Sequence, residues 1–173
     1  MLRNEVVLVD VNDKEIRSET KTNAHKQPLL HRAFSIFLYN SKKEILIQKR
    51  AANKYHSPNL WANACCSHPK KGENITDSAK ERLKDEIGVN TEIKELFSFI
   101  YLNKFNDDLY EYEYDHVFLG KYDGNVTLNE EEASETKWTT IEDLEKDLTE
   151  NPLKYASWFI ICAPKVLSYL KNL

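Results

Sequence analysis

The sequence predicts an α+β fold in which helices flank a mixed, largely antiparallel sheet. Several segments alternate apolar and polar residues with the period of two that is typical of strands. One segment in the middle of the chain and others near its end repeat apolar residues every three or four positions, as amphipathic helices do. The length of 173 residues predicts a single domain over residues 1–173.

The composition excludes several classes of protein. Hydrophobic residues make up 41% and charged residues 30% of the chain, a globular balance. The net charge of −4 argues against binding to nucleic acid. No apolar run approaches the roughly 20 residues that cross a bilayer, and the N-terminal stretch lacks a signal-peptide core. We therefore expect a cytoplasmic protein without membrane contact. No heptad pattern or apolar stripe marks an interface, so we expect a monomer.

The first half of the chain predicts four extended segments. Residues 5–11 (EVVLVDV) have a strand pattern. Residues 33–40 and 44–50 are two more apolar segments joined by a short polar turn, which predicts a hairpin. Residues 59–68 (NLWANACCSH) form a fourth extended candidate.

The next segment predicts a helix. Ala79, Leu83 and Ile87 recur every four residues, which places them on one helical face. Thr76 is a suitable N-terminal cap, and Gly88 is a suitable stop. We therefore expect this helix to begin near Thr76 and to end before Gly88.

Two long strand patterns follow at residues 91–105 and 109–122. In the second, Glu111 and Glu113 point to one face about 7 Å apart, and the tyrosines between them point to the other. On this strand alone, a solvated acidic face with the tyrosines packed inside is the simplest interpretation. The alternative is a pair of carboxylates that binds a cation.

The C-terminal part predicts one more strand, near Trp138, and then helices. Ile141, Leu144 and Leu148 lie on one helical face. A further helical stretch begins at Pro152. Because proline removes a helical hydrogen bond, we expect this stretch to be interrupted at Pro164.

The seven residues 63–69 read NACCSHP and contain two adjacent cysteines. Three cysteines cannot form a paired framework, and a disulfide between neighbours needs a strained ring. In an extended chain the side chains alternate, so Cys66 shares a face with Ala64 and His68, and Cys65 points with Asn63 and Ser67 to the other. Cys65 is then expected to be a packing residue, as is Cys162.

Histidines and charged side chains complete the candidates for chemistry. His25, His31 and His68, with the two glutamates, would form the nitrogen and oxygen shell that suits Zn, Mn or Mg, although their spacing matches no local zinc motif. A lone histidine is more often structural than a ligand. Arg82 and Glu86 form an ordinary i,i+4 pair or else meet a phosphate and a cation. Lys21, Arg50 and Lys54 are surface charges or anion ligands.

Five segments together resemble the type I isopentenyl-diphosphate Δ-isomerases, a branch of the Nudix fold. In chain order they are HRAFSIFLYN, QKRAANKYHSPNLWANACCSHP, KDEIGV, EYEYDHVF and YASWF. The resemblance covers roughly residues 5 to 165. Its most specific motif is N-x-x-C-x-H-P, supported by E-x-E downstream. The resemblance implies the α/β/α-like Nudix variant of the predicted α+β fold.

The resemblance also implies roles for individual residues. It implies catalytic roles for Cys66, Glu113 and Tyr101. It implies a divalent ion, Mn, Mg or Zn, held by His25, His31, His68, Glu111 and Glu113. It implies a second Mg²⁺ that Glu86 helps to hold on the substrate diphosphate. It implies that the prenyl diphosphate is bound by Lys21, Arg50, Lys54, Arg82 and Trp158.

The sequence departs from the family pattern in three places. The loop between His25 and His31 is one residue shorter, Ser67 replaces a glycine, and Cys65 stands beside the catalytic position. The Nudix hydrolase signature is eroded as well. Its REUxEE block (U is an aliphatic residue) aligns with residues 81–86, which read ERLKDE, and its first glycine falls on Ser67. A hydrolase needs that acid cluster to hold metal ions and activate water, so its loss favours the isomerase.

The implied reaction moves a double bond between isopentenyl and dimethylallyl diphosphate. The alkene is unactivated, so protonation to a tertiary carbocation must precede removal of a neighbouring proton. We expect Glu113, with Tyr101, to deliver the proton and Cys66 to remove one, with these roles exchanged in the reverse direction. Two alternatives stay open at this point: a metal-dependent Nudix pyrophosphohydrolase, and a metal-binding or redox-thiol domain without catalysis.

Overall fold

The computed structural model describes residues 4–173, and nine of its strands form one mixed sheet. The strands are β1 (Glu5–Val9), β2 (Glu15–Thr20), β3 (His31–Tyr39), β4 (Ile45–Arg50), β5 (Trp61–Ala62), β6 (Cys65–Ser67), β7 (Ile93–Asn106), β8 (Leu109–Lys121) and β9 (Ala133–Thr139). The helices of the described residues are α1 (Lys21–Lys26), α2 (Ile75–Ile87), α3 (Ile141–Glu150) and α4 (Ser157–Lys171), with a 3-10 turn η1 (Pro152–Lys154).

Strand β3 organises the sheet. It pairs antiparallel with β1, β4 and β6, and in parallel with β8 over nine residue pairs, from His31↔Glu113 to Tyr39↔Lys121. Strand β7 then pairs antiparallel with β8, and β9 with β4. The predicted α+β class, with a mixed and largely antiparallel sheet, is confirmed.

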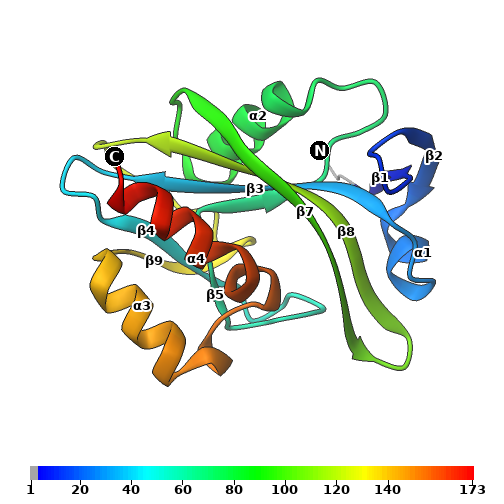
Figure 1. The fold of residues 1–173 in the computed structure, drawn as a ribbon. Helices are drawn as coiled ribbons and strands as arrows, with labels where there is room; N and C mark the ends of the chain where they lie inside the picture. The colour runs from blue at the N-terminus through cyan, green and yellow to red at the C-terminus, as the bar shows by residue number, and fades with distance from the viewer. Residues whose placement is uncertain (1–3) are drawn as a thin grey trace.

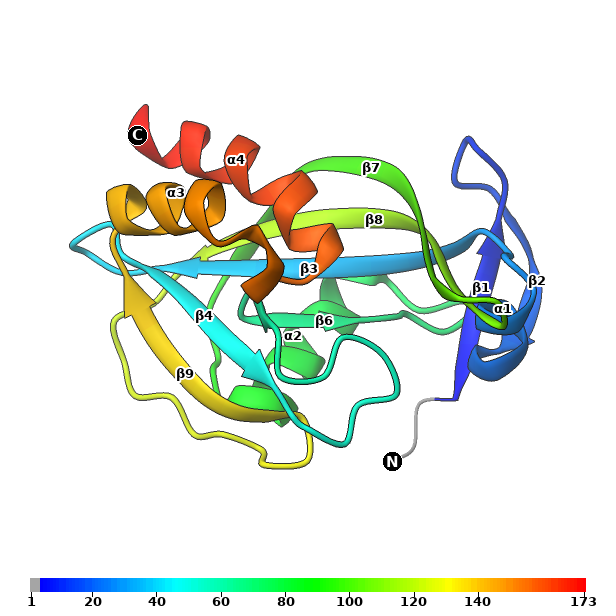
Figure 2. The same cartoon turned by 90° about the horizontal axis from the view of Figure 1, so that it is seen from below.

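Helices cover both faces of this sheet. Figure 2 shows α3 and α4 on one side of β3 and α2 on the other, and Figure 1 shows the β1–β2 hairpin and α1 at one end. The α4 side buries an apolar core that includes Phe37, Val117 and Phe159. The α2 side buries a second core that includes Phe34 and Leu83.

The N-cap of helix α2 lies two residues before the predicted cap. Asn74 is the N-cap, and its side-chain oxygen accepts a hydrogen bond from Asp77 N at 3.1 Å. Thr76, which was expected to cap, lies inside the first turn. The prediction was wrong because two good capping residues stand two positions apart, and the helix begins at the earlier one. Gly88 ends the helix in the left-handed region with φ of 68°, as predicted.

The expected interruption at Pro164 is also wrong, because α4 runs through it from Ser157 to Lys171. Proline removes the hydrogen bond to the carbonyl of Ile160, but Pro164 is exposed and Ile160 is 37% exposed, so water can reach that carbonyl. The buried face of the helix, which includes Phe159, Val166 and Leu170, keeps it packed on the sheet.

Three local features differ from the sequence expectations. Strand β2 and the short helix α1 were not predicted, and α1 is the element that carries Lys21 and His25. The extended candidate 59–68 is two short strands, β5 and β6, with a break at residues 63 and 64. That break changes the directions of the side chains around the cysteines.

Candidate active site

The acidic residues of β8 point into the protein. Glu111, Glu113 and Asp115 are 4%, 5% and 1% exposed, and the tyrosines on the opposite face are only half-buried. The interpretation of this strand as a solvated acidic face is therefore wrong. Burying three carboxylates is costly unless each meets a partner or a cation. Their neighbours decide what the site can do.

His31, at the start of β3, is oriented by the backbone. Its Nδ1 lies 2.9 Å from the carbonyl oxygen of Leu29, which can only accept a hydrogen bond. In a neutral ring this fixes the proton on Nδ1 and leaves the lone pair of Nε2 free. That Nε2 is buried without a hydrogen-bond partner, 3.3 Å from Oε2 of Glu113. Two acceptors that face each other at this distance favour a cation between them.

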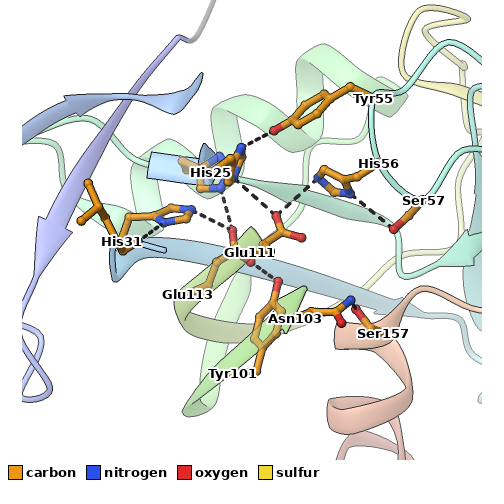
Figure 3. A network of polar contacts seen from close by, with 12 residues as sticks. His25, His31, Tyr55, His56, Ser57, Tyr101, Asn103, Glu111, Glu113 and Ser157 are labelled. Atoms are coloured by element: carbon orange, nitrogen blue, oxygen red, sulfur yellow. Dashed lines mark hydrogen bonds and ion pairs between the residues drawn. The ribbon is translucent and has the colours of Figure 1, made fainter. Parts of the chain in front are cut away.

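His25, on α1, is arranged in the same way (Figure 3). Its Nδ1 contacts the hydroxyl of Tyr55, and its Nε2 is buried without a hydrogen-bond partner, 3.9 Å from Oε1 of Glu111. The rings of His25 and His31 lie 5.2 Å apart, so the shortened loop still brings them together. Burial, reinforced by the neighbouring histidines, lowers the pKa of His25 to about 2, so the ring is neutral as a ligand must be.

His68 completes the group from the end of β6. Its Nε2 lies 2.7 Å from Oε2 of Glu113, and burial lowers its pKa to about 4. One ligand atom each from His25, His31 and His68 lie within 4.8 Å of one another, as do those of His68, Glu111 and Glu113.

This donor set fits a divalent cation. Buried atoms without a hydrogen-bond partner include Nε2 of His25, Nε2 of His31 and Oε2 of Glu111. Burial and then Glu113 raise the pKa of Glu111 well above its ordinary value. Burial opposes ionisation of Glu113. Its interactions with His31 and His68 outweigh burial and hold the pKa of this carboxyl well below its ordinary value. Neutral imidazoles and carboxylates are the ligands that Zn, Mn and Mg accept.

Tyr101 reaches Glu113 from the adjacent strand. The register of β7 and β8 places the two residues opposite each other, and the tyrosine hydroxyl donates a hydrogen bond to Oε1 of Glu113. Burial, followed by Glu111 and Glu113, raises the pKa of Tyr101 well above its ordinary value. The hydroxyl therefore keeps its proton beside an ionised carboxylate.

Asn63 holds Cys66 in place. Its amide nitrogen donates to the carbonyl oxygens of Ile36 at 3.0 Å and Cys65 at 2.9 Å. Its amide oxygen accepts from Sγ of Cys66 at 3.1 Å and from Nε1 of Trp158 at 3.2 Å. This one buried amide therefore joins β3, β6 and α4, which is a physical reason for the spacing N-x-x-C.

The two cysteines point to different sides of the sheet, as predicted, and both are free thiols. Cys66 lines the cavity, whereas Cys65 packs in the core on the α2 side. His68 lines the cavity with Cys66 as expected, but the expected places of Ala64 and Asn63 were wrong, because Ala64 packs with Cys65 and Asn63 reaches Cys66. The break at residues 63 and 64 shifts the alternation there. Ser67 continues β6 in extended backbone, which does not need a glycine.

Cys66 also faces a buried serine and acid. Its Sγ lies 3.6 Å from Oγ of Ser35, which donates a 2.7 Å hydrogen bond to Oδ2 of Asp115. Burial, and then Asp115, raises the pKa of the Cys66 thiol. At neutral pH the free protein therefore holds this cysteine protonated.

Cations gather at the other end of the site. Arg82 and Glu86 form the expected i,i+4 pair at 2.7 Å, and Glu132 adds contacts to Arg82 and Lys54. Cys65 is more than a packing residue, because its thiol donates to Oε2 of Glu86 at 3.1 Å. Nε of Arg50 and Nε of Arg82 are buried without a hydrogen-bond partner. Guanidinium donors of this kind can bind the oxygens of an anion.

A cavity of about 810 Å³ joins these groups. It brings together ten of the residues that the sequence singled out: Lys21, Arg50, Lys54, Cys66, His68, Arg82, Glu86, Glu111, Glu113 and Trp158. His25, His31 and Tyr101 lie behind this wall and touch its carboxylates. The Trp158 ring is 3% exposed, and the guanidinium carbon of Arg50 lies 5.1 Å from its centre.

Several residues that contact the site were not predicted from the sequence. Asp115 continues the two-residue alternation of the glutamates, so that signal was present. Asn63 stood in the motif but was given no role. Tyr55 and His56 follow Lys54 directly, and no periodicity distinguishes them. Ser35 and Glu132 carry no local signal, because only the pairing of distant strands brings them in.

Known protein families and sequences resemble this chain over most of its length. The model of the NUDIX domain family matches residues 29–159. The chain is 43% identical over 167 residues to isopentenyl-diphosphate Delta-isomerase 2 of Aromatoleum aromaticum, covering 96% of this chain and 88% of that protein. It is 44% identical over 155 residues to isopentenyl-diphosphate Delta-isomerase of Serratia proteamaculans, covering 90% of this chain and 87% of that protein.

Solved structures support the fold. The crystal structure of DR0079 from Deinococcus radiodurans superposes with a TM-score of 0.71 at 21% identity, over 85% of this chain and 90% of that chain. An Ap4A hydrolase of C. elegans gives a TM-score of 0.59 at 16% identity, over 82% of this chain and 98% of that chain. Fold alone does not separate isomerase from hydrolase, but the long sequence matches do. The chain belongs to the isopentenyl-diphosphate Delta-isomerase family, built on a Nudix domain.

Proposed function

We propose that this protein interconverts isopentenyl diphosphate and dimethylallyl diphosphate. The observation that carries the proposal is the arrangement of one cavity. Cys66 and Glu113, with Tyr101 behind it, supply acid–base groups at one part of it, and a cluster of lysines and arginines lies at another. The names of the curated relatives support the same reaction.

The chemistry requires both parts. Protonating the alkene gives a tertiary carbocation, whose neighbouring C–H is acidic enough for a side-chain base. We assign proton delivery to Glu113 with Tyr101, and proton removal to Cys66. The reverse reaction exchanges these roles, and the protonated thiol of the free protein is the form that it needs. The surroundings raise the pKa of Cys66 and lower that of Glu113, and such a separation of pKa values suits an acid and a base that exchange roles.

The proposed binding interactions position a small apolar group between the acid and the base. Lys21, Arg50, Lys54 and Arg82 would bind the diphosphate, whose binding energy holds the hydrocarbon end in place. Trp158 would face the carbocation with its π system, an interaction of roughly 2 kcal/mol when water is excluded. Both ideas rest on the lining of the cavity.

The metal belongs to the same proposal. His25, His31, His68, Glu111 and Glu113 would hold Mn, Mg or Zn, and Glu86 would help to hold a Mg²⁺ on the diphosphate. A divalent ion held here would supply Lewis acidity, and its ligation would fix the position of Glu113 and tune its acidity. The unpartnered nitrogen and oxygen atoms described above support this assignment.

A direct assay tests the proposal. Purified protein is incubated with Mg²⁺ and isopentenyl diphosphate, and the product is followed by NMR in the wild type and in Cys66→Ala. We expect dimethylallyl diphosphate from the wild type and almost none from the variant. Absence of isomer from the metal-loaded wild type would overturn the function, and full activity of Cys66→Ala would overturn the role of the thiol. Release of phosphate instead would indicate a pyrophosphohydrolase.

We further propose that residues 1–173 act as one catalytic domain, as a monomer in the cytoplasm. The cavity draws side chains from α1, α2 and α4, which supports a single unit. No helix of the described residues is long and apolar enough to cross a membrane. Light scattering behind size-exclusion chromatography tests the monomer, where a dimer mass would contradict it, and cell fractionation tests the location, where recovery outside the cytoplasm would contradict it.

A further inference from the structure

The loop of residues 51–60 between β4 and β5 has a fixed base next to the metal site. Arg50 N donates to the carbonyl of Leu60 at 2.8 Å, and Asn59 N donates to the carbonyl of Arg50 at 3.1 Å. Ser57 and Asn59 adopt left-handed backbone with φ of 51° and 61°. These contacts fix both ends of the loop, so its central residues are held over the site.

Tyr55 in this loop contacts a metal ligand from outside. Its hydroxyl meets Nδ1 of His25, although the whole residue is 53% exposed (Figure 3). If Nδ1 donates to the hydroxyl oxygen, the lone pair of Nε2 stays free on the side of the metal ligands. The Nζ atom of Lys21 lies over the ring of Tyr55, 5.5 Å from its centre. In that tautomer, Tyr55 does for His25 what the Leu29 carbonyl does for His31.

His56, the next residue, contacts a second ligand. Its Nε2 lies 3.5 Å from Oε1 of Glu111, and its Nδ1 lies 3.3 Å from Oγ of Ser57. The ring is held firmly, because it stacks on Phe105 at 4.8 Å and meets the edge of Trp158 at 6.1 Å. Its side chain is only 6% exposed. Such a ring can fix the direction of one carboxylate oxygen.

We propose that Tyr55 and His56 are positioning residues of the metal site, with Tyr55 orienting His25 and His56 orienting Glu111. The inference rests on the metal ligands of the proposed function and adds the groups that aim two of them. Partners of this kind fix the tautomer and direction of a ligand, and their loss typically costs about 10- to 100-fold in metal affinity. Neither residue belongs to the groups of described side chains whose ligand atoms lie within 4.8 Å of one another.

The alternative is that the pair only covers the cavity. Tyr55 would then contribute through its ring, and Phe would replace it without loss. The two explanations differ at a single oxygen atom, so Tyr55→Phe separates them. Tyr110→Phe is a matched control on the outward face of β8, where Lys104 lies 5.7 Å from the centre of the ring. Asn53→Ala is a control in the same loop, because Asn53 is exposed and has no role in the proposed metal or diphosphate binding.

The experiment measures binding of Co²⁺ alone to metal-stripped full-length protein, without substrate. Visible absorption reports the ligand field, and competition with a chelator gives the affinity. We expect Tyr55→Phe and His56→Leu to weaken Co²⁺ binding by about 10-fold or more and to change the spectrum. Both controls should keep the affinity and spectrum of the wild type.

The outcomes separate this inference from the proposed function. Wild-type affinity and spectrum in Tyr55→Phe would overturn the role of Tyr55, and the same result in His56→Leu would overturn that of His56. If His56→Leu does not fold, as judged by circular dichroism, His56→Gln replaces it. A wild type that binds no Co²⁺ would overturn the metal site and this inference with it. The isomerase reaction is tested separately by the NMR assay, because Co²⁺ binding is measured without substrate.

Discussion

The two ends of the β3–β8 pair are built from opposite kinds of residue. At one end, His31 lies opposite the buried carboxylate of Glu113, and Ala33 lies opposite that of Asp115. At the other, Phe37 and Leu119 lie opposite each other in an apolar core. The same parallel register runs through both, so backbone pairing does not distinguish them.

The difference indicates a division of labour along two strands. Burying apolar side chains contributes roughly 25 cal/mol per Å², whereas burying carboxylates costs free energy unless they are paired. The apolar end should therefore supply stability. The polar end should supply chemistry, and it should be stable only because the rest of the fold holds it. Substitutions that change one property without the other test this division.

The largest effect is expected at the polar end, from Glu113→Gln. Losing an acid–base group should lower the isomerisation rate by about 10³- to 10⁴-fold, or roughly 4–5.5 kcal/mol in the barrier. The free energy of unfolding should change by less than about 1 kcal/mol, because Gln keeps an oxygen for Tyr101. NMR kinetics and urea unfolding measure the two values. A loss of several kcal/mol of unfolding free energy in Glu113→Gln would contradict the division between an apolar end that supplies stability and a polar end that supplies chemistry.

The apolar end should respond in the opposite way. Phe37 is fully buried and stacks on Phe159 at 5.7 Å, so Phe37→Ala should cost about 3–5 kcal/mol of unfolding free energy. The control is Leu102→Ala on β7, where the side chain is 59% exposed and the cost should stay within about 0.5 kcal/mol. Isomerase activity per folded molecule should survive in both. A catalytic loss in Phe37→Ala as deep as that of Glu113→Gln would contradict the comparison.

The same contrast explains what the sequence could predict. Strands such as β8 and helices such as α3 have strong periodicity, so local pattern was enough. Donor chemistry suggested the ligands, but the spacing of His25, His31 and His68 alone is a weak signal, so their assignment depended on the family resemblance. Ser35 was not predicted as a site residue, because its contact with Asp115 joins residues 80 positions apart. Competing local signals caused the errors at Thr76 and Pro164.

The metal would add stability at the polar end, and its effect should be intermediate. An ion that binds only the folded chain stabilises it by about 2.7 kcal/mol at a concentration 100 times the dissociation constant. Adding Mn²⁺ to metal-stripped protein should therefore raise the urea midpoint by a corresponding amount. His31→Gln should lose most of this increase, because Nε2 of His31 has no other partner. An equal increase in both proteins would place the ion elsewhere.

The smallest effect concerns α2, which serves both ends. Leu83 packs in the apolar core, and Arg82 and Glu86 face the cavity. The N-cap of this helix is Asn74, so Asn74→Ala should cost about 1 kcal/mol of unfolding free energy.

Thr76→Ala is the matched control for this cap. It removes a residue with the same capping potential that lies inside the first turn, so its cost should be a few tenths of a kcal/mol. Because the cap lies at the start of the helix, both variants should keep the isomerase rate. Urea unfolding and the NMR assay again measure the two values. An equal loss of stability in both would mean that the helix begins later than Ile75. A fall in rate in Asn74→Ala alone would mean that the start of α2 positions Arg82 and Glu86, so that stability and chemistry are not separate on this helix.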